Sequence, residues 1–289
     1  MPLFDHYIAI DWSAANQPVR GANSIWWASV SRNGAISLEN FSTRLETMIN
    51  LGEQIRRVIR SGERLLIGFD FAFGFPSGLA KTITGVAHWT ALWDRIGTWV
   101  QDDARNRNNR FEVGSRLNAV IGLEEGPFWG HPHQHMDRYD NLKPKSPPDL
   151  PVSFPRKRRV ETRQRSAKSV FQLAYTGSVG SQSILGMAAL NRLRSDPDIG
   201  DAIAIWPFET HFAADLSKPV TVVEIYPSAH SVDRSSHDII DAAQVLSVAR
   251  DMAAWDRSGA MPDKLSAFGL TDLERSLVLT EEGWIFGTA

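Results

Sequence analysis

The stretch Tyr7-Ile8-Ala9-Ile10-Asp11-Trp12-Ser13 decides the fold that this sequence predicts. Its apolar run indicates a buried strand, and a buried strand tolerates a lone carboxylate only where something compensates the charge. Because side chains alternate along a strand, Tyr7, Ala9, Asp11 and Ser13 share one face. An acid at the end of a buried first strand is a common way to hold a hard metal ion. An Asp that merely begins a turn would look the same, so this stretch alone leaves both interpretations open.

A second buried run, Arg64 to Asp70, also ends in an acid. Between the two runs lie two strand-like segments, Ser24 to Ser31 and Ala35 to Phe41, separated by an Asn-Gly turn that is typical of a hairpin. An amphipathic helix follows over Leu45 to Arg60. This order predicts an α/β protein with three antiparallel strands, a helix, and a fourth strand parallel to the first.

The rest of the chain is less regular until its last quarter. The sequence predicts helices over Gly85 to Arg105, Ser183 to Leu193 and His237 to Trp255, strands over Ala202 to Pro207 and Thr221 to Tyr226, and irregular structure over Phe128 to Pro155. We therefore expect a core built from residues 1–75 and 218–289. A mostly helical insertion with an irregular basic segment is expected over residues 76–217.

Composition limits the classes of function. The chain has 289 residues, of which 43% are hydrophobic and 22% charged, as expected for a globular protein with a substantial core. It contains no Cys, which excludes disulfides, thiolate metal sites and Cys nucleophiles. The sequence shows neither a signal-peptide pattern nor the roughly 18 consecutive apolar residues of a membrane span. We expect a cytoplasmic protein without a membrane partner.

The charge is unevenly distributed, although the net charge is only −2. Arg156 to Lys168 holds seven basic residues and one acid, a net +6, so the other 276 residues sum to −8. Such a strip could guide a phosphate-bearing substrate toward an acidic site, or it could be an ordinary solvated loop. The candidate substrate-binding residues are Ser13, Arg156, Arg158, Arg159 and Arg163.

Acidic side chains recur where the predicted strands and the last helix come together. Asp11 and Asp70 end parallel strands, at the edge where open α/β sheets place their sites, and Glu224 lies in the last strand. Asp238 and Asp241 are three residues apart, so they would share a face in the first turn of the last helix, where the helix dipole alone would also favour acids. If these acids converge, divalent cations must neutralise them, and Mg²⁺ or Mn²⁺ suits an all-oxygen site. Two such ions about 4 Å apart would stabilise the attacking and leaving oxygens of a phosphoryl transfer.

This order of elements resembles the RNase H-like fold, and Asp238 to Ala243 is similar to the D-x-x-D-A segment of Holliday-junction resolvases. A closer resemblance is to the domain of unknown function 429, a family described as predicted nucleases of the RNase H-like fold. The segments that resemble that family are Ile10 to Ser13, Gly68 to Pro76, Val223 to Pro227, Asp238 to Ala242 and Glu282 to Ile285.

The resemblance implies that Asp11, Asp70, Asp238 and Asp241 are metal ligands and that Glu224 lines a catalytic site with them. No acid of the Leu45 to Arg60 helix matches the helix-borne Glu of RNase H, because Glu46 and Glu53 look like solvated residues. We expect metal-dependent hydrolysis of a phosphodiester by activated water, on a short or single-stranded nucleic acid or a nucleotide.

Two other functions stay open at this stage. One is an enzyme acting on a nucleotide-containing small molecule, either kinase-like or related to molybdopterin guanine dinucleotide, a label that similar chains sometimes carry. The other is a non-catalytic binding module that keeps the fold.

Two further motifs each allow a functional and a purely structural interpretation. His131, His133 and His135 alternate as zinc ligands can, but the interleaved Pro132 favours a surface loop. Gly177 to Ser183 opens a helix whose backbone amides could hold a phosphate, although a simple capped start explains the same residues.

Overall fold

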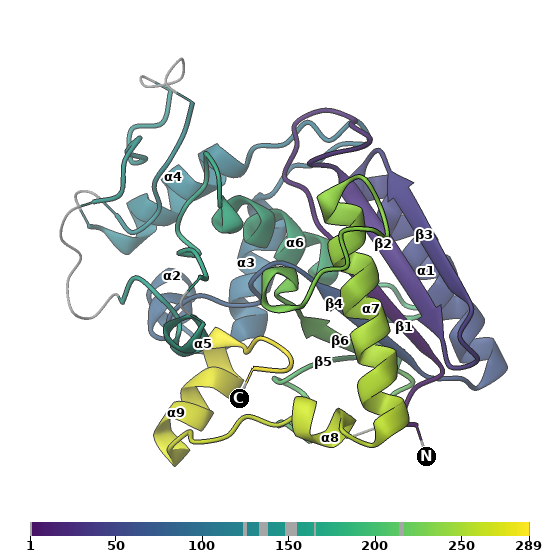
Figure 1. Ribbon diagram of the computed structural model, residues 1–289. Helices are drawn as coiled ribbons and strands as arrows, with labels where there is room; N and C mark the ends of the chain where they lie inside the picture. The colour runs from purple at the N-terminus through teal and green to yellow at the C-terminus, as the bar shows by residue number, and fades with distance from the viewer. Residues whose placement is uncertain are drawn as a thin grey trace.

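A mixed sheet with strand order β3-β2-β1-β4-β6-β5 forms the centre of the molecule (Figure 1). The computed structural model describes residues 2–123, 126–132, 138–147, 155–164, 166–213 and 217–288. The strands are β1 (His6–Asp11), β2 (Ile25–Ser31), β3 (Ile36–Phe41), β4 (Leu65–Phe69), β5 (Ile203–Ile205) and β6 (Val220–Glu224).

The strand pairing brings the carboxyl ends of three strands to one edge of the sheet. β1, β2 and β3 pair antiparallel, whereas β1 pairs parallel with β4, and β4 with β6. Ile10 lies opposite Phe69, and Phe69 lies opposite Glu224. Asp11, Asp70 and Glu224 therefore meet at the same edge, and the predicted α/β order of three antiparallel strands, a helix and a parallel strand is confirmed. The outermost strand β5 comes from residues 76–217, so that stretch contributes to the sheet as well as to the helices.

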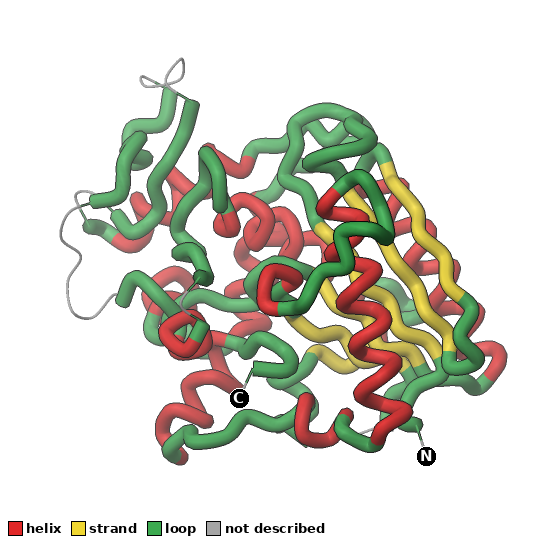
Figure 2. The backbone as a smooth tube through the Cα atoms, in the orientation of Figure 1, coloured by secondary structure: helices red, strands yellow, loops and turns green. Residues whose placement is uncertain are grey.

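Helices cover both faces of the sheet (Figure 2). They are α1 (Arg44–Ser61), α2 (Leu79–Thr84), α3 (Trp89–Trp99), α4 (Arg110–Ile121), α5 (Arg159–Arg163), α6 (Val179–Arg194), α7 (Ile240–Ser258), α8 (Met261–Lys264) and α9 (Asp272–Leu277), with single turns at Gly200–Ala202, Pro227–Ala229 and Val278–Glu282. The helix predicted over Gly85 to Arg105 is shorter than expected, because Gly85 ends α2 in the left-handed conformation and Val100 ends α3 in an extended one. Within the described residues, no helix combines the length and apolar character needed to cross a membrane.

The last long helix begins three residues later than predicted. The His237 Nδ1 atom accepts a hydrogen bond from the Ile239 amide at 2.9 Å, and the imidazole packs against Trp26 with ring centroids 5.0 Å apart. These contacts keep the chain extended up to Ile239, and α7 starts at Ile240. The prediction that Asp238 shares the first helical turn with Asp241 is therefore wrong.

Alternating side chains of the central strands face two different layers, as the strand pattern predicts. Tyr7 and Ala9 join the apolar cluster of α7, whereas Ile8 and Ile10 join the cluster that contains α1 and α6. Figure 1 shows α7 lying across the face of β1 and β2. The approach of α7 is close at Gly68, where an added Cβ would lie 2.8 Å from the Met252 Cε atom and 2.5 Å from the Ile225 Cγ2 atom. Each large apolar side chain buried in these layers contributes about 1.5–3 kcal/mol.

A buried carboxylate fixes α7 against the start of β1. Asp256 accepts hydrogen bonds from the amides of Leu3 and Phe4, both at 2.8 Å, and from the Tyr7 hydroxyl at 2.7 Å. Burial, together with this carboxylate, raises the pKa of Tyr7 far above its ordinary value, so the hydroxyl stays a donor. Since β1 carries Asp11 and α7 carries Asp241, this contact sets the position of one acid relative to the other.

Replacing Asp256 with Ala should lower the free energy of unfolding by about 3 kcal/mol, because it leaves two buried amides and a hydroxyl without their acceptor. Urea denaturation followed by circular dichroism measures this change. The matched control is Asp263→Ala, at an exposed Asp on the neighbouring α8. Equal stabilities of the two variants would contradict the role given to Asp256.

Candidate active site

Two carboxyl groups meet where β1 and β4 end. The Asp70 Oδ1 atom accepts a hydrogen bond from the Trp12 amide at 2.6 Å, and the Asp70 amide donates to the Ile10 carbonyl at 3.3 Å. The Asp11 and Asp70 side chains lie close enough for each to perturb the pKa of the other. The pair follows directly from the parallel register, because the residue after each strand lies at the same level.

The two acids perturb each other strongly. Burial raises the pKa of Asp11 well above its ordinary value, and the charge of Asp70 raises it further. Burial also raises the pKa of Asp70, to about 6, although the hydrogen bonds from Asp11 and the Trp12 amide oppose the rise. Two carboxyls in contact cannot both ionise without a cation, so the pair retains a proton well above the ordinary pKa of Asp.

Asp241 approaches this pair from the first turn of α7. Its Oδ2 atom accepts a hydrogen bond from the Asn23 amide at 2.8 Å, and its charge raises the pKa of both Asp11 and Asp70. The structure thus brings together three acids that are distant in sequence. No Lys or Arg within the described residues forms an ion pair with any of the three.

The acids open onto two cavities. A cavity of about 500 Å³ is lined by Asp11, Ser13 and Asp241, and one of about 130 Å³ is lined by Asp70 and Glu224. Gln182 of α6 lines both and donates to the Trp12 carbonyl at 2.5 Å. Ser13 is buried, and its Oγ atom donates to the Asn23 carbonyl at 3.3 Å, so it forms part of the wall.

Glu224 lies beside the acids but is neutralised by Arg158. The Arg158 guanidinium donates to both Glu224 carboxylate oxygens, at 2.5 and 2.8 Å, and to Glu161 at 2.8 Å. All three side chains are buried, and the Phe73 amide also donates to Glu224 at 3.0 Å. Glu224 was expected to line the site beside the metal-binding acids, and it does line the 130 Å³ cavity with Asp70, but Arg158 already compensates its charge.

The remaining basic candidates bind protein groups. Arg159 pairs with Glu282, Arg163 donates to the Gly269 carbonyl at 3.0 Å, and Arg156 donates to the Ser146 hydroxyl at 2.8 Å. None of the four arginines lines the 500 Å³ cavity. These contacts attach part of the segment to the tail and to neighbouring loops, whereas Arg156, Arg163 and Lys168 stay exposed, so a substrate-guiding role for the segment stays a prediction.

Other predicted positions lie away from the acid pair. Asp238 is exposed and precedes α7. His131 is buried, with its Nδ1 atom 3.0 Å from the Pro132 carbonyl, whereas His133 and His135 lie outside the described residues. The first amides of α6, those of residues 179–181, donate to backbone carbonyls, which favours the simple helix start over the phosphate site.

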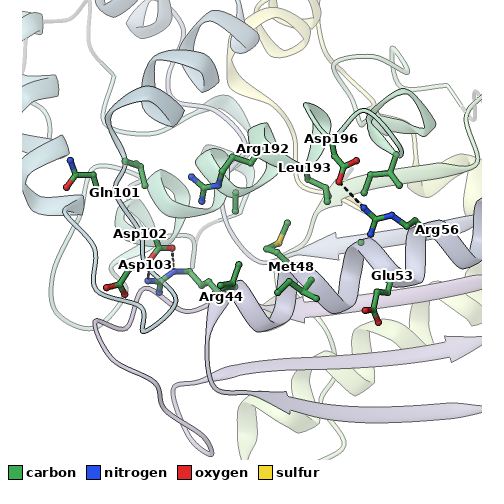
Figure 3. Close-up of a pocket in the computed structure, with 16 residues that line it drawn as sticks. Arg44, Met48, Glu53, Arg56, Gln101, Asp102, Asp103, Arg192, Leu193 and Asp196 are labelled. Atoms are coloured by element: carbon green, nitrogen blue, oxygen red, sulfur yellow. Dashed lines mark hydrogen bonds and ion pairs between the residues drawn. The ribbon is translucent and has the colours of Figure 1, made fainter.

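A further cavity, of about 640 Å³, lies elsewhere, between α1, the end of α6 and the segment after α3 (Figure 3). Two ion pairs lie on its wall, Arg44 with Asp102 at 2.6 Å and Arg56 with Asp196 at 3.1 Å. Arg44 also donates to the Ser13 carbonyl at 2.8 Å, so it holds the segment after β1 in place. None of the three acids lines this cavity.

Sequence reasoning missed Arg110, which lines the same cavity as Asp11 and Asp241. It follows an Asn-rich segment, residues 106–109, that carries no recognised motif. Its place beside the acids depends on contacts between α4, α6 and the segment after β1, and these cannot be read from local sequence.

The donor set suits a hard divalent cation. It contains only carboxylate oxygens, and no Lys or Arg of the described residues forms an ion pair with them. No group of three or more acidic or His side chains in the described part of the chain has the spacing to hold an ion by itself. Mg²⁺ commonly binds one or two carboxylates and completes its shell with water and substrate oxygens, and Asp11 and Asp70 fit that mode.

Comparison of the chain with protein-family models, curated proteins and solved structures gives no match. The fold and site define an α/β protein with a carboxyl pair at the carboxyl edge of its parallel strands. The resemblance to the domain of unknown function 429 stays a prediction.

Without divalent ions, stability should fall as the pH rises from about 4 to above 6, because folded Asp70 holds its proton up to about pH 6 and the unfolded chain loses it near pH 4. The shift in the pKa of Asp70 corresponds to roughly 3 kcal/mol of stability, which solvent screening reduces to about 2 kcal/mol. Asp70→Asn should therefore stabilise the protein by about 2 kcal/mol at pH 8 and by almost nothing at pH 4. Denaturation in EDTA at both pH values measures the difference, with the exposed Asp263→Asn as control. If Asp70→Asn differed from the wild type by the same free energy of unfolding at pH 4 and at pH 8, the pairing of the acids would be contradicted.

Arg158→Met should destabilise the protein by about 3–5 kcal/mol, because Glu224 and Glu161 would be buried without a counter-charge. Arg192→Met, at an exposed Arg of α6, should change stability by less than about 0.5 kcal/mol. A stable Arg158→Met protein with weakened substrate binding would instead restore the predicted substrate role.

Proposed function

We propose that this chain is a metal-dependent phosphodiester hydrolase with an RNase H-like core. The observation that carries the proposal is the Asp11–Asp70 carboxyl pair, with Asp241 beside it and no cation of the described chain paired to them. Three antiparallel strands followed by a parallel β4, with an acid-bearing helix α7 packed on β1, support the RNase H-like arrangement.

The proposed ion is Mg²⁺ or Mn²⁺, held by Asp11 and Asp70. A divalent cation there would supply Lewis-acid activation of water and neutralise charge that develops on a phosphate. Asp11 and Asp70 would bind the ion only after losing their shared proton, and the Trp12 amide would keep Asp70 oriented. One ion is the better supported arrangement. A second ion would require Asp241 to turn from the Asn23 amide toward the pair.

The electrostatics favour a small or single-stranded substrate. The net charge is −2, and Glu224 and Glu282 already neutralise Arg158 and Arg159, which disfavours binding to the many phosphates of a long duplex. The two cavities beside the acids admit a short segment. We therefore propose a nucleotide or single-stranded nucleic acid as substrate.

The test compares wild-type protein with Asp11→Asn. Mn²⁺ should raise the melting temperature of the wild type and support cleavage of a labelled single-stranded oligonucleotide. Asp11→Asn should stay folded, lose the Mn²⁺ stabilisation and lose at least about 100-fold in cleavage rate, because metal-ion catalysis supplies several kcal/mol. Asp238→Asn is the matched control, since Asp238 is exposed and lies before α7, and it should lose little activity.

Each alternative predicts a different result. An enzyme acting on a nucleotide-containing small molecule would be stabilised by ATP with Mg²⁺ and would leave oligonucleotides intact. A non-catalytic module would show neither response. Equal Mn²⁺ stabilisation of wild type and Asp11→Asn would place the ion elsewhere and overturn the proposal.

A further inference from the structure

Arg110 is a partly buried cation whose protein contacts are all neutral. At the start of α4, its Nε atom donates to the Ser181 hydroxyl at 3.0 Å, and its Nη1 atom donates to the side chains of Asn108, at 2.8 Å, and Asn16. The guanidinium also lies 4.3 Å from the centre of the Phe111 ring. Its Nη2 atom has no hydrogen-bond partner within the described residues.

Among the described residues, no carboxylate forms an ion pair with Arg110. Burial lowers the pKa of Arg110 to about 10, and the positive charge of Arg44 lowers it too, so the group is still charged at neutral pH. Within the described residues, the buried arginines are each paired with a carboxylate, Arg44 with Asp102 and Arg158 with Glu224. A desolvated cation with only neutral partners is costly unless an anion joins it.

The polar surroundings of Arg110 in the 500 Å³ cavity suit an anion. Thr176 and Ser178 line the same cavity, and their hydroxyls have no hydrogen-bond partner in the described part of the chain. Asp11 and Asp241 line it as well, so an anion bound at Arg110 would share the cavity with the proposed metal site. Guanidinium and hydroxyl donors are the usual partners of a phosphate.

An aromatic ring lies at the same cavity. Tyr175 lines it with 52% of its surface exposed, and its hydroxyl donates to the His131 carbonyl at 2.9 Å. Its backbone has φ +71°, a left-handed conformation that non-glycine residues rarely adopt. An exposed, positioned ring beside phosphate-binding groups is how many proteins stack a base of single-stranded nucleic acid.

We propose that the 500 Å³ cavity binds one nucleotide unit, with its phosphate at Arg110, Thr176 and Ser178 and its base stacked on Tyr175. Cavities of about 300–1,000 Å³ hold ligands of this size. The inference rests on the proposed function in one respect, because it takes this nucleotide to be part of the substrate that is hydrolysed at Asp11 and Asp70. In this proposal the cavity recognises a nucleotide, and Arg110 selects its phosphate.

Calorimetry of the full chain with deoxyadenosine 5′-monophosphate tests the assignment, in Mn²⁺ and separately in EDTA. Arg110→Met should weaken binding at least about tenfold, and Arg110→Lys should recover part of the loss because it keeps the charge. Arg107→Met is the matched control, at an exposed Arg that pairs with Asp103 outside this cavity, and should bind as the wild type does.

Tyr175→Ala separates base recognition from phosphate recognition. It should weaken binding of deoxyadenosine 5′-monophosphate about tenfold and leave binding of inorganic phosphate unchanged, because only the base stacks on the ring. This comparison decides the base site even if Arg110→Met fails to fold.

The outcomes distinguish the two proposals. Nucleotide binding in EDTA that depends on Arg110 and Tyr175, without any Mn²⁺ binding or cleavage, would sustain the nucleotide site and overturn the hydrolase. Mn²⁺ binding through Asp11 without measurable nucleotide binding, or with equal affinity in wild type, Arg110→Met and Tyr175→Ala, would overturn the nucleotide site alone.

Discussion

Repulsion between the Asp11 and Asp70 carboxyls is the constraint that organises this molecule. Parallel pairing of β1 with β4 places both acids at one level, and burial raises the pKa of each. Without a ligand this arrangement is unfavourable, because two adjacent carboxylates repel each other. A retained proton or a bound cation removes that repulsion. Contacts elsewhere must therefore hold the two strand ends in place. Residues that destabilise a fold in this way are common where a protein binds an ion or a substrate.

The rest of the core supplies that support. Asp256 ties α7 to the start of β1, and the Arg158–Glu224 pair fixes the end of β6 next to β4. Arg44 binds the Ser13 carbonyl and Asp102 at once, so the segment after β1 is held from behind. Each contact is buried and joins residues far apart in sequence, which is how a sheet edge stays rigid around unfavourable charges.

The sequence predicts the sheet better than it predicts the site. Apolar runs that end in Asp, the Asn-Gly hairpin and helical periodicity are local signals, and they correctly place β1 to β4, α1 and α7. The start of α7 is not predicted, because the contact of His237 with Trp26 keeps Asp238 outside the helix. The environments of Arg158 and Arg110 are not predicted either. Their burial depends on the tail and on α4, and a basic residue in a basic segment looks the same whether it faces solvent or the core.

Arg44 and Arg158, which are buried, differ from the partly buried Arg110 in their counter-charges. Arg44 and Arg158 each lie against a carboxylate of the chain, so the folded protein already compensates their charge. Arg110 is bound by amide and hydroxyl oxygens only, and the acids on its cavity form ion pairs with no cation of the described residues. A phosphate-bearing ligand that binds together with a divalent cation would compensate both sets of charges. Its phosphate would face Arg110, and the cation would face the acids. If the cavity binds both ligands as proposed, charge balance would couple nucleotide affinity to metal affinity, and each ligand should strengthen the binding of the other.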